Sequence, residues 1–161
     1  MSIESIVNQS LDLIGYKKHI GSIWDGSVAA RVALNAYSET RDEVLAAQPW
    51  VFARDLFILD AISGPSSAGV YSFTRPETAI TILDVYPYPR VLLEPTPGRW
   101  SESYENSARI IVAQHPKVGV VATLRLTNWA IWPPEFTQAV IRMLAEKLSR
   151  SLVEPPPKEE K

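Results

Sequence analysis

Cysteine is absent from this chain of 161 residues, which excludes disulfide bonds, thiol catalysis and cysteine-ligated metals. Histidine is scarce as well, because His19 and His115 are the only two in the sequence. Neither has a histidine or acidic neighbour at the spacing of a helical metal site. We therefore expect no metal ion, no cofactor and no catalytic triad based on histidine.

Long hydrophobic runs and a basic charge excess are also missing. The longest apolar stretch, around residues 118–122, is far shorter than the roughly 20 residues that span a bilayer. Residues 1–4 lack the basic start of a signal peptide, so we expect none. The net charge of −2 argues against a dedicated nucleic-acid binder. With 46% hydrophobic and 21% charged residues, the chain has the composition of a soluble globular domain without a membrane partner.

Helical periodicity is present in three segments. Residues 3–14 place apolar side chains on one face, with Ser2 as the N-cap and Gly15 as the stop. Residues 28–48 follow Asp25 and Ser27, either of which is a capping residue, and end before Pro49. Residues 135–152 follow two prolines and are apolar on more than one side. The sequence therefore predicts helices at both ends of the chain.

Between the helices, short runs rich in Val, Ile, Tyr and Phe alternate with Gly, Pro and Ser. They predict strands at 51–60, 70–74, 80–86, 90–94, 99–104, 108–113 and 118–127, the last two joined as a hairpin across residues 115–117. We predict an α+β fold, in which the N- and C-terminal helices form a bundle and a small antiparallel β region (about 50–128) is inserted. The chain is interpreted as a single domain, 1–153, followed by a tail, 154–161.

Arg41 falls on the apolar side of the second helix, and a buried arginine must be paired. Its partner is either a carboxylate from another segment of the chain, which we favour, or a neighbouring subunit. Trp50 and Phe52 are interpreted as a plug of the core where the helix meets the β region. For Trp129 and Trp132, beside two prolines, a core role and an exposed contact role are equally supported.

Three prolines in the tail favour an extended polyproline conformation. The candidate contact residues for partners are Arg41, Trp129, Trp132, Pro155, Pro156, Pro157 and Lys158. One carboxylate pair, Glu102 and Glu105, lies beside aromatic residues and would suit glycoside cleavage if held at the proper separation. Solvated surface glutamates are the favoured interpretation, and we expect no catalytic residues and no enzyme activity.

The order of elements resembles the head-to-tail adaptor proteins of short-tailed bacteriophages, the family of tail tubular protein A. The resemblance covers nearly the whole chain. Its densest matches are Leu13 and Gly15; Ile23, Asp25, Ser27 and Ala30; Tyr37, Arg41 and Leu45; and Trp50, Phe52 and Ala53. Two features depart from the family: Ser72–Arg75 lengthen the spacing between a tyrosine and a proline, and the C-terminal part is short.

The resemblance implies a structural protein of the virion neck, assembled in the host cytoplasm. Members form a ring of twelve copies that joins the portal protein to the tail tube or nozzle, and genomic DNA passes through the lumen without sequence-specific binding. A mildly acidic chain suits such a conduit, because a basic lumen would grip phosphates. The alternatives are a tail completion or terminator protein and a glycan-cleaving tail component.

Overall fold

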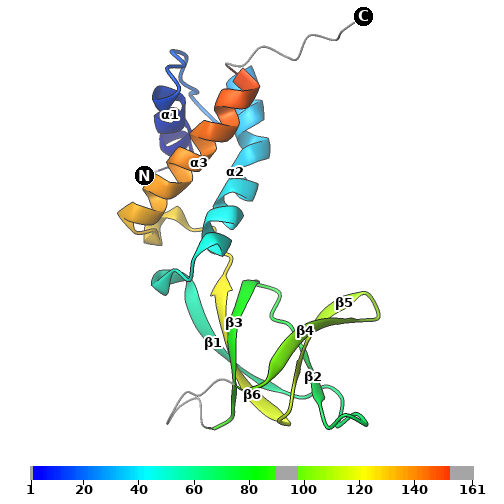
Figure 1. Cartoon of the computed structure of the whole chain (residues 1–161). Helices are drawn as coiled ribbons and strands as arrows, with labels where there is room; N and C mark the ends of the chain where they lie inside the picture. The colour runs from blue at the N-terminus through cyan, green and yellow to red at the C-terminus, as the bar shows by residue number, and fades with distance from the viewer. Residues whose placement is uncertain (1, 90–97, 153–161) are drawn as a thin grey trace, which may run out of the picture. The chain divides into compact units, whose positions relative to one another are not determined.

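A computed structural model describes residues 2–89 and 98–152. The chain divides into two compact units. One comprises Met1–Gln48 with Leu126–Lys161, and the other comprises Pro49–Arg125. Figure 1 shows helices in the first unit and strands in the second, so the fold is α+β with the β region inserted between helices, as the sequence predicts.

The helical unit consists of α1 (Ile3–Leu13), α2 (Val28–Ala47) and α3 (Pro134–Leu152). Helix α3 packs against both other helices, so the N-terminal and C-terminal helices pack together, as predicted. The Ser10 hydroxyl of α1 donates to the Ile141 carbonyl of α3 at 3.0 Å, which fixes the closest approach of these helices. The buried core combines aliphatic side chains with the rings of Tyr37, Trp132 and Phe136; its aliphatic members include Ile6, Val7, Leu11, Val44, Leu45, Val140, Ile141, Leu144 and Leu148.

The helix ends follow local sequence signals. The Ser2 and Ser27 hydroxyls accept from the backbone N–H groups of Ser5 and Ala30, so each serine caps its helix. At the end of α1, Gly15 has φ of +72°, which allows the chain to reverse in a left-handed turn. Both caps and the glycine stop therefore occur where the sequence predicts them.

The β unit begins with the short 3-10 helix η1 (Val51–Ala53) and holds two antiparallel sheets. In the first, β6 (Lys117–Leu124) lies between β1 (Arg54–Asp60) and β3 (Ala79–Pro87). In the second, β5 (Ala108–Ala113) lies between β2 (Tyr71–Thr74) and β4 (Trp100–Glu105). Residues of both sheets share one buried cluster: Phe73, Ala79, Ile82, Val85, Ile111, Ala113, Val118, Val120 and Ala122. The strand expected at 90–94 lies outside the described residues.

The predicted hairpin between the last two strands is wrong. Strand β5 pairs with β2 and β4, whereas β6 is the central strand of the other sheet. The physical reason is burial: β6 is enclosed on both faces and needs a partner at each edge, and β1 and β3 fill both positions. The hairpin instead joins β4 to β5 through Asn106 and Ser107, which both have positive φ, as two-residue hairpin turns require.

Trp50 and Phe52 at the start of the β unit are half-buried and meet edge to face, with ring centroids 6.1 Å apart. The fully buried residue of this turn is Ala53. The expected plug of the core is therefore only partly enclosed.

Candidate interaction site

A cleft lies beside the start of α3, where the chain returns to the helical unit. The Asn128 side chain accepts from the Ala130 N–H at 3.0 Å and starts the 3-10 helix η3 (Trp129–Ile131). Two prolines follow, and Pro134 is the first residue of α3, a position where the missing proline N–H costs nothing. This local chemistry sets two tryptophans, three residues apart, at a sharp corner of the chain.

Trp132 is a core residue. It is 7% exposed, stacks on Tyr37 of α2 with centroids 6.5 Å apart, and meets Phe136 edge-on at 4.9 Å. The indole N–H of Trp132 and the hydroxyl of Tyr37 are both buried, and neither has a hydrogen-bond partner among the described residues. Burial raises the pKa of Tyr37, and the nearby Arg41 charge opposes this rise.

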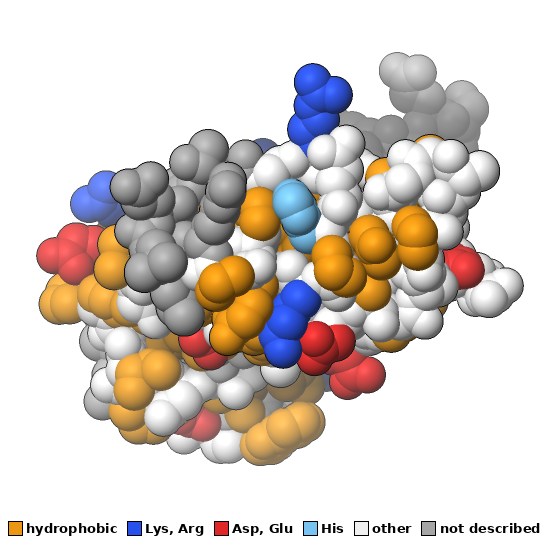
Figure 2. Space-filling view, turned by 90° about the horizontal axis from the view of Figure 1, so that it is seen from below, with side chains coloured by type: hydrophobic (Ala, Val, Ile, Leu, Met, Phe, Trp, Pro, Cys, Tyr) orange, Lys and Arg blue, Asp and Glu red, His pale blue; other side chains and the backbone are white. Residues whose placement is uncertain are grey.

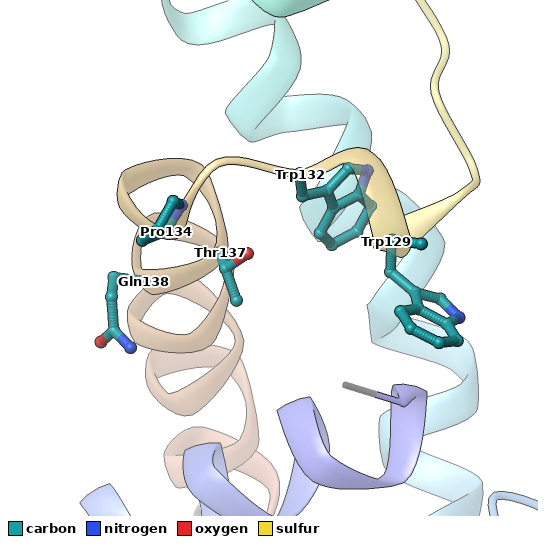
Figure 3. Close-up of a pocket in the computed structure, with 6 residues that line it drawn as sticks. Trp129, Trp132, Pro134, Thr137 and Gln138 are labelled. Atoms are coloured by element: carbon teal, nitrogen blue, oxygen red, sulfur yellow. The ribbon is translucent and has the colours of Figure 1, made fainter.

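Trp129 is only half-buried and forms one wall of a cleft of about 330 Å³. Figure 3 shows the wall residues: Trp129 on η3, Trp132 after it, and Pro134, Thr137 and Gln138 on the first turns of α3. A second hollow shares Pro134 and Gln138 and continues along α3 to Arg142. The two tryptophans that the sequence left undecided therefore differ: Trp132 serves the core, and Trp129 lines an open surface.

Arg41 is 8% exposed and pairs with a carboxylate of its own chain. The expected source of the carboxylate was wrong, because it is not another segment but the next residue. Arg41 Nε donates to Asp42 Oδ1 at 2.8 Å, and its terminal nitrogen lies 2.7 Å from the same oxygen. The buried cation is thus compensated at its own helix turn. The other candidates, Pro155, Pro156, Pro157 and Lys158, lie outside the described residues.

Trp24 is an exposed aromatic residue that the sequence analysis did not select. Its side chain is 75% exposed in the loop between α1 and α2. Asp25 braces this loop, since its carboxylate accepts from the N–H groups of Ser27 at 2.9 Å and Gly21 at 3.1 Å. Hydrogen bonds from the Ser27 side chain and backbone lower the pKa of Asp25. The sequence did hold a signal for this exposed residue, because Trp24 is flanked by the turn-forming residues Ser22, Asp25 and Gly26.

Other apolar side chains are exposed in both units. In the helical unit they include Leu13, Val28 and Ile131, and in the β unit Val51, Leu56, Ile58, Ile62, Tyr88 and Tyr104. Figure 2 shows one face of the molecule, where hydrophobic side chains form several separate groups with charged side chains between them.

Glu102 and Glu105 are not held side by side as a carboxylate pair. They are three residues apart on β4, and successive strand residues alternate, so the two side chains leave opposite faces. The Glu102 carboxylate accepts from Arg75 Nε at 2.7 Å and lies 3.6 Å from an Arg109 nitrogen. It is therefore committed to a structural ion pair, and nothing places Glu105 beside it.

Neither histidine contributes to a metal site in the described parts of the chain, which hold no group of three potential ligands. His19 Nε2 lies 2.6 Å from Asp12 Oδ1, an exposed pair that sequence spacing did not reveal. Over residues 2–89 and 98–152, no helix is both long and apolar enough to cross a membrane.

No protein-family model matches the chain, and a search of curated proteins finds no match. The inference of function therefore rests on the sequence and on the geometry of these surfaces.

Proposed function

We propose that the protein is a structural head-to-tail adaptor of a short-tailed bacteriophage. It assembles into a ring, with twelve copies as the expected number, that joins the portal to the tail and leaves a lumen for DNA. A closed ring requires two different surfaces on each copy that are complementary to one another. The exposed aromatic and aliphatic side chains described above provide material for such contacts.

The observation that carries the proposal is the turn that presents Trp24. Ile23, Asp25, Ser27 and Ala30 belong to the densest part of the resemblance to the adaptor family. Asp25 holds this turn and Ser27 caps α2, so the matched residues form the structure that displays the tryptophan. These hydrogen bonds restrain the backbone of the turn, so the loop that carries the exposed indole loses little conformational entropy on binding. Tryptophan is also enriched at interface hot spots.

The test is self-association of the purified full-length chain, measured by sedimentation velocity. We expect closed oligomers for the wild type. Trp24→Ala should weaken association by at least about tenfold, as for a hot-spot residue, while Trp24→Phe should retain part of it. Unfolding by urea provides the folding control, because a side chain that is 75% exposed contributes little to the core.

A chain that forms no ring, either alone or when mixed with the portal protein, contradicts the proposal. If Trp24→Ala associates as strongly as the wild type, the contact between copies does not lie at this turn. Rings that bind a tail tube but not a portal would favour the tail completion or terminator alternative.

A further inference from the structure

The cleft beside Trp129 has the chemistry that recognises a polyproline segment. It is lined by the half-buried indole of Trp129, by Pro134 and by the small exposed part of Trp132, with Thr137 and Gln138 at one side. Proline-rich peptides bind to aromatic-lined grooves of this kind, because their extended helix is already formed and costs little entropy. The cleft is open on the surface of the helical unit.

The chain itself carries a matching segment just after α3. Residues 154–158 read Glu-Pro-Pro-Pro-Lys, and three consecutive prolines favour the polyproline conformation. Their place in the sequence fixes how far they extend, since α3 ends at Leu152. The relevant distance is therefore that between the end of α3 and the cleft near its beginning.

A copy cannot place these prolines in its own cleft. From Thr137 to Leu152 the helix rises by 15 residues, or about 22 Å. Pro157 follows Leu152 by five residues, which reach at most about 18 Å when fully extended. The chain would also have to reverse direction around the end of α3, which shortens its reach further. The cleft is accessible to these prolines only if they belong to a second copy.

Charges beside the cleft agree with this occupant and set its direction. Glu135 and Arg142 are exposed, lie two helical turns apart, about 10 Å, and form no ion pair with any described residue. Glu154 and Lys158 flank the prolines and are separated by about 12 Å in a polyproline helix. Opposite charges meet when Glu154 faces Arg142 and Lys158 faces Glu135, with the three prolines between them against the cleft.

We propose that residues 154–158 of one copy bind the surface of a neighbouring copy that runs from Trp129 to Arg142. The contact is heterologous, with the segment on one side and the cleft on the other, so it can be repeated around a closed ring. It deepens the proposed ring assembly and rests on it. The segment would link each subunit to the next.

A double-mutant cycle in the full-length chain tests the contact. Trp129→Ala and the triple change of Pro155, Pro156 and Pro157 to Ala should each weaken self-association by about tenfold or more. Because they remove the same contact from its two sides, the combination should be little worse than either alone. Additive losses would overturn the proposal, as would association at wild-type strength in either variant.

Charge exchange tests the direction of the segment. Arg142→Glu and Glu154→Arg should each weaken association by roughly two- to fivefold, and the double variant should recover it. Arg99→Glu is the matched control, because Arg99 is exposed in the β unit and lines neither the cleft nor the hollow beside it, so it should leave association unchanged. Failure of the double variant to recover association would exclude this register.

Cross-linking identifies the occupant directly. A photoactivatable residue in place of Lys158, in a mixture of isotopically labelled and unlabelled full-length chains, should cross-link to residues 129–142 of a different copy. Cross-links within one copy, or only to another virion protein, would overturn the contact between copies. Rings that persist without these cross-links would overturn this inference and leave the adaptor proposal intact, whereas a chain that forms no ring and binds no portal would contradict both.

Discussion

Replacing Tyr37 by phenylalanine should stabilise the protein. Tyr37 is 8% exposed and stacks on Trp132, yet its buried hydroxyl has no hydrogen-bond partner among the described residues. An unpaired polar group in such a site costs about 1–3 kcal/mol relative to water. Tyr37→Phe removes that cost, retains the ring stack and leaves a space of only one oxygen atom. We expect the free energy of unfolding to rise by about 1 kcal/mol.

The alkaline pH dependence gives a second, independent signature. Burial raises the pKa of Tyr37 above its ordinary value, so the folded protein holds the phenolic proton more tightly than the unfolded chain does. The resulting stability is present below pH of about 10 and is lost as the pH rises through the raised pKa. Tyr37→Phe should therefore lose less stability than the wild type between neutral and strongly alkaline pH.

Urea unfolding at several pH values measures both effects. Tyr86→Phe is the matched control, because the Tyr86 hydroxyl donates to Asp84 at 3.3 Å and its removal should give no gain at neutral pH. A loss of 1 kcal/mol or more in Tyr37→Phe would mean that its hydroxyl is satisfied, and would refute the reasoning.

Two further substitutions test local structure by urea unfolding. Asn8→Ala should lower the free energy of unfolding by about 1–3 kcal/mol. The Asn8 side-chain amide donates to the Ile20 carbonyl at 3.0 Å and accepts from the Ile20 N–H at 2.9 Å, and both hydrogen bonds would be lost. An unchanged stability would show that other contacts hold this loop. Gly64→Ala should cost at least about 1–3 kcal/mol, since its φ is +125° and a Cβ would lie 2.9 Å from the Tyr71 Cα. Gly69→Ala, at φ of +71° in open space, should cost less, and equal losses would contradict the steric argument.

The helices could be predicted from sequence because their signals are local. Ser2, Ser27 and Gly15 act on backbone groups within one turn, and Pro49 excludes continuation of α2 beyond Gln48. Strand partners could not be predicted in the same way, since closeness along the chain does not decide which edges pair. The hairpin that exists, between β4 and β5, turns at Asn106 and Ser107, which the sequence analysis did not single out as a turn.

The candidate site was only partly predictable for a related reason. Trp129 and Trp132 have similar neighbours in sequence, and only the position of Tyr37, almost a hundred residues earlier, makes one of them core. Arg41 was correctly placed on a buried face, but a carboxylate on the adjacent residue was not considered as its partner. The exposure of Trp24 could not be predicted from the sequence, because it depends on how hydrogen bonds such as that from the Gly21 N–H to Asp25 hold the loop.

The most direct measurement of the central claim is electron microscopy of the purified full-length chain mixed with the portal protein of the genome that encodes it. The account predicts closed rings with a central channel, bound coaxially to one end of the portal. Single copies of the 18.0 kDa chain, with no ring and no bound portal, would contradict it.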